Sequence, residues 1–178
     1  MFRNCTSLTK TAEIRDLKVA NVSCFHNMYE GCISLTEAHD IKYDKLPADS
    51  CNSMFKNCTS LTRAPKLLAV KVDKIAYNNM FEGCTNLSYI ECAMVRDSSV
   101  FGDSWVSGVG SSGTFVKNEL QTKYEYSDNS IPTGWEIVNK NFSDETERED
   151  PAKADYLTFV TKSPNATLSF SKDANHNP

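Results

Sequence analysis

The sequence lacks the features of several protein classes. Basic residues are not in excess, since the formal net charge is −4 over 178 residues and the isoelectric point is about 5.4. A stripe of Lys and Arg that could bind phosphates is therefore missing, which argues against nucleic acid as the main partner. No apolar run approaches the ~18 residues that a membrane span needs, and no signal peptide is present. The sequence thus predicts no membrane span in this fragment.

Metal-binding and catalytic patterns are also missing. The three histidines, His26, His39 and His176, are scattered, and no two cysteines have C-x-x-C spacing, so a zinc site is not indicated. Cys24 lies close to His26 in the sequence, but residues two apart on a helix do not share a face. No carboxylate that could orient the histidine is indicated either. We therefore predict no catalytic residue, no metal, no cofactor and no enzymatic activity.

What the sequence does contain is one nine-residue phrase written four times. The copies MFRNCTSLT, MYEGCISLT, MFKNCTSLT and MFEGCTNLS begin at Met1, Met28, Met54 and Met80, so the intervals are 27, 26 and 26 residues. The cysteine and the leucine of each copy keep the same step. A period of about 20 to 29 residues with one fixed leucine is typical of leucine-rich solenoids, in which neighbouring units stack and share one core.

The segment around each methionine has the period of a short helix. Cys24, Met28 and Cys32 fall at i, i+4 and i+8, which places them on one helical face. The predicted helix starts are Ser23, Asp49 or Ser50, and Asp73. The predicted helix ends are Asn4, Gly31, Asn57 and Gly83, because Gly and Asn best tolerate the left-handed conformation that closes a helix.

The segment after each leucine has the pattern of a short strand. These segments cover residues 8–14, 35–41, 61–67 and 87–93, and stacking would pair them into a parallel sheet. Pro65 limits the regularity of the ladder in the third copy, because proline donates no hydrogen bond. The predicted fold is therefore a right-handed α/β leucine-rich-repeat solenoid, with parallel strands plus short helices at a period of 26–27 residues.

The phrase M-F-x-x-C-T-S-L-T-x-A-P-x-L resembles the BspA-like leucine-rich repeats of Bacteroidetes surface and secreted proteins. The segments WVSGVGSSGTFVKNEL and IPTGWEIVN resemble the unit that closes such arrays, so the resemblance covers about residues 1 to 138. His39 and Glu91 stand where the family favours proline, and the first copy has an extra residue. The resemblance implies an extracellular binding or adhesion scaffold without catalysis, at the cell surface or secreted, and it names no ligand.

Four regions are expected along the chain. Residues 1–97 form the leucine-rich repeats, the first incomplete, and residues 98–139 form a β-rich C-terminal cap. An acidic, core-poor linker follows at 140–154. Residues 155–178 begin a further β module. The chain begins inside a repeat and ends inside this module, so we expect it to be a fragment of a longer protein.

The seven cysteines are predicted to be free. Their number is odd, and Cys5, Cys32, Cys58 and Cys84 share one position of the phrase. Side chains at equivalent positions of stacked units point the same way, whereas a disulfide needs its Cβ atoms about 3.8 Å apart and turned toward each other. We therefore expect thiols buried as small hydrophobic groups.

The predicted partner-binding face consists of strand residues that point away from the core. It comprises Lys10, Glu37, His39, Arg63, Lys66, Tyr89 and Glu91. Alternating charges are equally typical of a solvated face, where they stabilise neighbouring strands. Tyr89 beside Trp105 is the more ligand-like feature, although Trp105 and Trp135 are also typical of buried residues that cover the last rung.

These patterns favour a non-enzymatic recognition or adhesion scaffold that binds a host protein or glycan on a bacterial surface. A structural spacer that positions another domain of a longer protein is the alternative, and part of an enzyme whose site lies outside this fragment is a third. Because the first copy lacks its leading helix, its edge is open, and we expect self-association there or fraying of that copy.

Overall fold

The computed structural model describes residues 1–12, 23–43, 45–73 and 75–143. The chain divides into two units, Met1–Glu147 and Arg148–Pro178, and every described residue belongs to the first. The predicted β module and most of the predicted linker lie outside the described residues, as do residues 13 and 14 of the first predicted strand.

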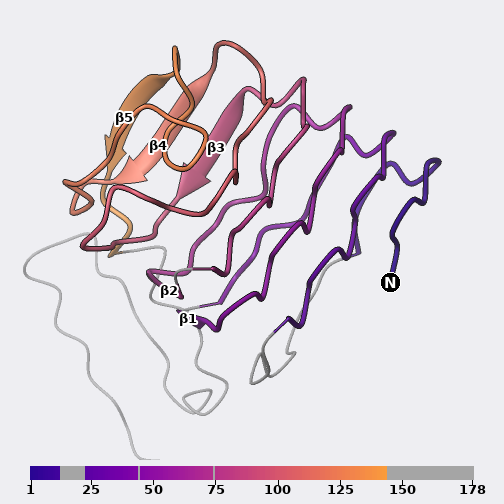
Figure 1. The fold of residues 1–178 in the computed structure, drawn as a ribbon, viewed down its shortest axis with the longest axis horizontal. Helices are drawn as coiled ribbons and strands as arrows, with labels where there is room; N and C mark the ends of the chain where they lie inside the picture. The colour runs from indigo at the N-terminus through magenta and orange to yellow at the C-terminus, as the bar shows by residue number, and fades with distance from the viewer. Residues whose placement is uncertain (13–22, 44, 74, 144–178) are drawn as a thin grey trace, which may run out of the picture. The chain divides into compact units, whose positions relative to one another are not determined.

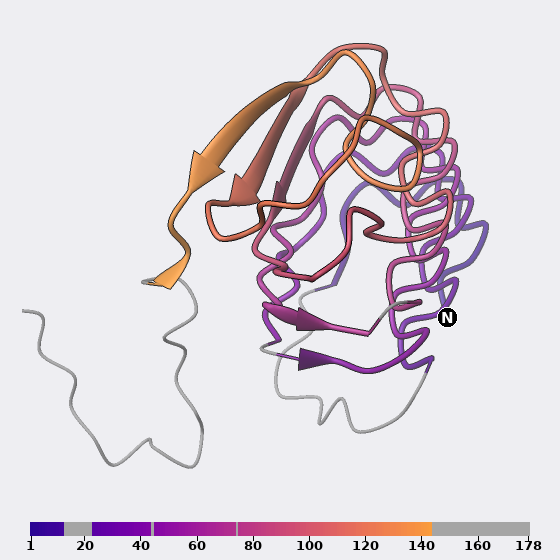
Figure 2. The ribbon, with the colours of Figure 1, turned by 60° about the vertical axis from the view of Figure 1, so that its left-hand side comes forward.

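Five strands in two parallel sheets make up the regular structure of this part of the chain (Figure 1). The smaller sheet pairs β1 (Lys45–Leu46) with β2 (Lys71–Val72). The larger sheet has the order β3 (Tyr89–Cys92), β4 (Thr114–Asn118) and β5 (Glu136–Lys140). In Figure 2 these three strands lie side by side, while the turns of the repeated phrase are stacked on the opposite side of the unit.

The predicted α/β leucine-rich-repeat solenoid is wrong. The described residues have almost no helix (1%), and their strands form two small parallel sheets. The segments around Met28, Met54 and Met80, predicted to be short helices, are series of hydrogen-bonded turns.

The hydrogen bonds explain why these segments are not helical. In an α-helix each N–H bonds to the carbonyl four residues earlier. Here the N–H of Met28 donates to the carbonyl of Phe25 at 3.1 Å, within the turn, while the N–H of Tyr29 donates to Met54 of the next copy at 2.9 Å. This alternation runs through the whole segment. Half of the donors are therefore used between segments about 26 residues apart, and a continuous helix cannot form.

Backbone conformation gives the second reason. Every fourth residue from Ser23 to Gly31 is left-handed, at Ser23 (φ 62°), Asn27 (φ 54°) and Gly31 (φ 72°), and such residues interrupt a right-handed helix. Asn4, Gly31, Asn57 and Gly83 are left-handed as predicted, with φ of 59°, 72°, 60° and 74°, but turns precede them, so their prediction as helix ends is wrong. Ser23 and Asp49 are left-handed as well, so their prediction as helix starts is wrong.

Among the described parts of the predicted strands, a strand forms only in the fourth copy, where Tyr89–Cys92 of the predicted 87–93 is β3. In the earlier copies the ladder is reduced to isolated bridges, such as Lys10 with Glu37 and Ile41 with Leu67. Arg63 lies opposite Tyr89, but Leu67 lies opposite Cys92, so the third copy uses one more residue than the fourth. Pro65 lies inside this bulge, which agrees with the prediction that proline makes the ladder irregular there.

The core contains rows of side chains from the aromatic, cysteine and leucine positions of the phrase. The rings of Phe2, Tyr29, Phe55 and Phe81 stack in order, with centroids 5.5, 5.5 and 5.8 Å apart, and Trp105 follows at 6.1 Å. The phrase leucines Leu35, Leu61 and Leu87 are fully buried. The repeated residues are therefore packing residues.

The cysteine row is part of the same core. Cys32, Cys58 and Cys84 are buried, as predicted, but Cys5 is exposed, because no segment of the described chain covers the first copy. Each buried thiol of the row donates to the carbonyl of the aromatic residue in the preceding copy, for example Cys84 Sγ to Phe55 at 3.0 Å. All seven cysteines are free in the structure.

The two tryptophans are buried at the other end of these rows. Trp105 is 0% exposed and donates from Nε1 to the carbonyl of Ser130 at 2.6 Å. Trp135 is 3% exposed and donates to the carbonyl of Gly110 at 2.7 Å. Both are therefore buried covering residues, and Trp105 is not a surface partner of Tyr89.

Candidate functional site

The first part of the predicted face is an exposed ion pair. Lys10 and Glu37 lie opposite each other, and their side-chain atoms Nζ and Oε1 are 2.5 Å apart. More than half of each side chain is exposed, so the pair contributes little to stability. These two residues are brought together, as their equal position in the phrase predicts.

The second part is a stack of Arg63 on Tyr89. The two residues lie opposite each other, and the guanidinium carbon is 3.7 Å from the centroid of the ring, which is a cation–π contact. Arg63 Nη2 is also 3.7 Å from Glu91 Oε2, and the Tyr89 hydroxyl donates to the same oxygen at 3.4 Å. Three of the predicted residues thus form one connected cluster.

Glu91 lies at the centre of that cluster and is nearly buried. Only 4% of its side chain is exposed, and a buried carboxylate is costly unless basic groups pair with it. Lys140 Nζ is 2.6 Å from Oε1, and Lys66 Nζ is 3.8 Å from the same atom. With Arg63 on Oε2, three basic side chains converge on one carboxylate.

His39 joins neither the Lys10–Glu37 ion pair nor the cluster around Glu91. Its Nδ1 lies 3.1 Å from Thr11 Oγ1, and its backbone N–H donates to the same hydroxyl at 2.8 Å. The side chain is half-buried and lines a small cavity with Ala12 and Asp40. His39 therefore connects the first two copies.

Lys140 belongs to the candidate site but is not predicted by the sequence. It lies 49 residues after Glu91, so the 26-residue period does not relate them, and it was assigned to the linker. The register of the larger sheet, which only the structure shows, accounts for the contact: Glu91 lies opposite Val116, and Val116 lies opposite Val138. Lys140 is two residues beyond Val138, and alternate residues of a strand share a face.

The structure places a carboxylate beside His26, which corrects the prediction that none orients it. His26 Nδ1 is 2.9 Å from Asp49 Oδ2, which also accepts a hydrogen bond from Ser23 at 2.6 Å. Burial raises the pKa of Asp49, but the hydrogen bonds from Ser23, Asn52 and His26 outweigh it and hold the pKa below its usual value. Within the described part of the chain no hydrogen bond joins Cys24 to His26, so the geometry provides no nucleophile–base pair.

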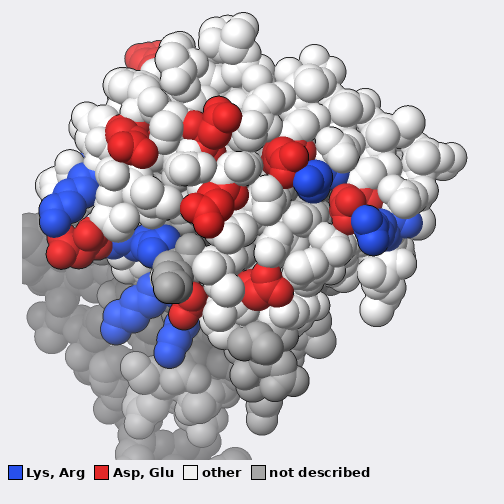
Figure 3. Space-filling view, viewed as in Figure 1, with Lys and Arg blue, Asp and Glu red and all other residues white. Residues whose placement is uncertain are grey.

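The described residues contain no group of three or more His, Cys, Asp or Glu side chains that could hold a metal ion. In the same residues, no helix has the length and apolar character needed to cross a membrane. Most of the face shown in Figure 3 belongs to uncharged residues, and several acidic side chains lie directly beside basic ones. The arrangement can hold a partner by charge and stacking contacts.

Comparison with known proteins identifies no relative of this chain. No family model matches the chain, and neither a curated protein nor a solved structure matches it.

Proposed function

We propose that this chain is a non-enzymatic recognition module that binds an extracellular protein or glycan through the Arg63–Tyr89 stack. The observation that carries the proposal is the stack itself, with its guanidinium 3.7 Å from the ring centroid and 55% of the Arg63 side chain exposed. Arginine and tyrosine are among the residues that contribute most to binding at protein interfaces. Aromatic side chains of this kind can also stack on partner groups.

Preorganisation supports the same proposal. Ordering a long side chain on binding costs about 0.5–1.5 kcal/mol. Arg63 is already held by Tyr89 and by Glu91, and Tyr89 is fixed in β3, so much of that cost is met before a partner arrives. Lys10 and Glu37 extend the face toward the first copy, where their exposed ion pair can be exchanged for contacts with a charged partner.

The proposed location is the surface of a bacterial cell or its surroundings. Its support is the resemblance of the repeated phrase to BspA-like surface proteins, and it rests on the sequence alone. The alternative, a spacer that positions another domain, is favoured by the Lys10–Glu37 pair, in which the exposed charges satisfy each other.

Binding measurements on two variants test the proposal. The parent chain is screened on a glycan array and on a panel of purified host extracellular proteins. Arg63→Ala and Tyr89→Ala are each expected to weaken binding of the ligand that the screen finds by about 1 kcal/mol or more, with little change in the thermal midpoint of unfolding. Lys56→Ala is the matched control, because it removes a cation from an ion pair with Glu82 on the turn side (2.7 Å).

Two outcomes contradict the proposal. If Lys56→Ala abolishes binding while both face variants bind like the parent, the partner uses the turn side. If neither the array nor the panel yields a ligand for the parent chain, the spacer is the better description.

A further inference from the structure

The end of β5 and the residues after it lie against the partner-binding face. Lys140 closes β5, and its Nζ reaches Glu91 Oε1 at 2.6 Å across 49 residues of sequence. Phe142, two residues later, is 1% exposed and packs in a cluster with Leu68, Ala93 and Val116. The chain therefore covers its own face with one basic and one aromatic side chain.

The surface beneath this segment lies outside the main core. Ile90 and Phe115 lie opposite each other in β3 and β4 and belong to the main core. Glu91 and Val116 are the next pair, and because side chains alternate along a strand they point to the other face of the sheet. Phe142 packs on that other face, where it forms a second, separate cluster.

We call Leu68, Ala93, Val116 and Glu91 the floor, and Lys140–Phe142 the covering segment. The backbone of the floor is held by contacts that do not involve the covering segment. Ala93 donates its N–H to the carbonyl of Leu67 at 2.8 Å and accepts from Asn118 Nδ2 at 2.9 Å. Leu68 donates its N–H to Ile41 at 3.3 Å. The floor would therefore persist when the covering segment moves away.

Without the segment, a charged group and an apolar patch of the floor would both lose their contacts. The Glu91 carboxylate would lose its shortest ion pair, and the apolar patch of Leu68, Ala93 and Val116 would meet water. The covering segment satisfies both, because Lys140 pairs with Glu91 and Phe142 packs on the apolar patch. Lys140 Nζ also lies 5.1 Å from the centroid of the Phe142 ring. Its backbone is fixed as well, because Glu119 donates its N–H to the carbonyl of Lys140 at 2.9 Å.

We infer that this face of β3 and β4 is a peptide-binding pocket for an extended segment that carries a basic residue and, two positions later, an aromatic one. Lys140–Phe142 is the intramolecular occupant. A tethered occupant has an effective concentration in the millimolar range, so a partner peptide of the same chemistry binds strongly only when the tethered segment leaves. This pocket adjoins the exposed Arg63–Tyr89 stack, because Glu91 borders both and Tyr89 packs against the same apolar cluster.

The test uses the full chain with the double substitution Lys140→Ala and Phe142→Ala, which removes both anchoring side chains. The probe is a fluorescein-labelled synthetic peptide with the sequence of Ile137–Ser143, and its binding is measured by fluorescence polarisation. Saturable binding to the double variant is expected, at least tenfold tighter than to the parent chain. A peptide with alanine in place of both the lysine and the phenylalanine should not bind.

Further variants locate the site. In the double-variant background, Glu91→Gln should lower the affinity for the labelled peptide at least tenfold. Glu136→Gln, which changes an exposed carboxylate of β5, should leave the affinity unchanged. Peptide binding that does not depend on its lysine and phenylalanine, or on Glu91, overturns the proposal.

Folding of the variants is checked by the fluorescence of the two buried tryptophans. The single variant Phe142→Ala, which keeps the Lys140–Glu91 ion pair, is measured in parallel. If both variants lose the native tryptophan signal, the floor does not form without its occupant, and the proposal fails. If the double variant is folded and binds no peptide, it fails as well.

Discussion

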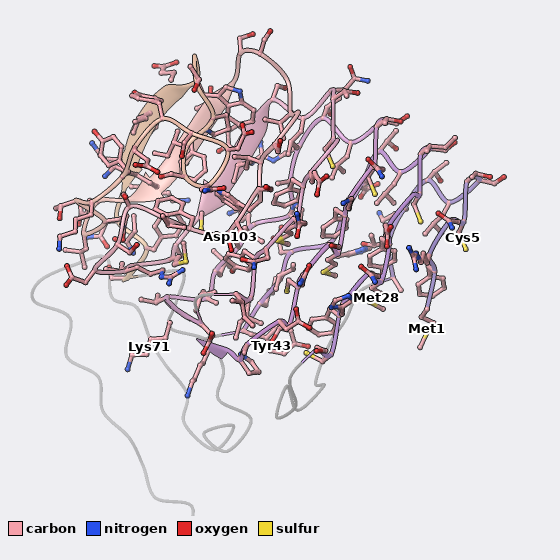
Figure 4. All side chains as sticks on the ribbon, in the orientation of Figure 1. Met1, Cys5, Met28, Tyr43, Lys71 and Asp103 are labelled. Carbon is pink, nitrogen blue, oxygen red and sulfur yellow. The ribbon has the colours of Figure 1, made fainter. Side chains whose placement is uncertain are left out.

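The two ends of the stacked turns differ in how they are covered. At one end, Trp105 is fully buried and hydrogen-bonded, and the chain from Asp128 to Ser130 accepts donors from the last turn. At the other end, Met1 is 95% exposed and the Cys5 thiol is exposed (Figure 4). The same phrase is therefore a core element in one place and a surface in another. What a residue contributes depends on which neighbour covers it.

The largest expected difference between the ends concerns their aromatic residues. Trp105→Ala should lower the free energy of unfolding by about 3–5 kcal/mol, because it leaves a cavity among Tyr77, Phe81 and Phe115. Phe2→Ala should cost only about 1 kcal/mol, because Phe2 stacks on Tyr29 alone and is partly exposed. Urea unfolding curves of both variants provide the measurement. Equal losses would show that the first copy is as well covered as the last.

The next difference concerns two equivalent glycines. Gly83 has φ +74°, and a Cβ there would lie 2.2 Å from Asn57 Oδ1; Gly31 has φ +72° and the same distance to Asn4. Alanine at either position costs about 1–2 kcal/mol for the left-handed backbone alone. Asn57 and Asn4 are both exposed. Gly83→Ala should nevertheless cost more than Gly31→Ala, because the turn of Asn57 is bonded to copies on both sides (Gly31 N–H to Lys56, Asn57 N–H to Glu82), whereas among the described residues the turn of Asn4 is bonded only to the second copy.

The same urea titrations provide a control for the clash. Adding Asn57→Gly to Gly83→Ala should recover part of the stability, since glycine accepts φ 60° and removes the colliding oxygen. No recovery would mean that the backbone conformation, and not the neighbouring asparagine, sets the cost.

The smallest expected difference concerns how readily the cysteines react with iodoacetamide. Iodoacetamide should label all seven cysteines in denaturant without reductant, but only Cys5 and Cys24 in the native protein. Burial raises the pKa of Cys84 and of Cys92 to about 12, so at neutral pH these thiols carry almost no reactive thiolate. Intact mass gives the number of labels. Three or fewer labels in denaturant would restore a disulfide framework.

The same reagent tests the proposed self-association of the open end. Labelling of Cys5 should slow as the protein concentration rises, while labelling of Cys24, which is also exposed, should not change. Equal rates at every concentration, with a monomer in light scattering, would contradict association through the first copy.

The period of the phrase predicts which residues are neighbours, and it does so for a physical reason. Residues one period apart occupy equivalent places, so Lys10 meets Glu37 and Arg63 meets Tyr89. The period does not relate Lys140 or Phe142 to Glu91, because Lys140 ends β5, Phe142 follows two residues later, and both lie outside the repeats. The burial of Glu91 was therefore beyond what its position in the phrase could predict.

The error about helices has an equally specific cause. Cys24, Met28 and Cys32 repeat every four residues, a spacing that fits both a helix of 3.6 residues per turn and a series of four-residue turns. Ser23 and Gly31, with Asn27 between them, repeat at the same spacing, and each is left-handed. Small or amide residues at every fourth position indicate the turns, because an amphipathic helix does not require them.

The direction of the hydrogen bonds between copies has a consequence for synthesis. Phe2, Tyr29 and Phe55 donate their N–H groups to carbonyls of the copy that follows, at 2.9, 2.9 and 3.0 Å. A ribosome adds about 5–20 residues per second, so each turn waits on the order of one to five seconds for its acceptors. The newest turn of a nascent chain therefore lacks the native acceptors of these donors until the next copy is made. This series ends when the carbonyls of Asp128 and Asn129 emerge to accept the donors of the last turn.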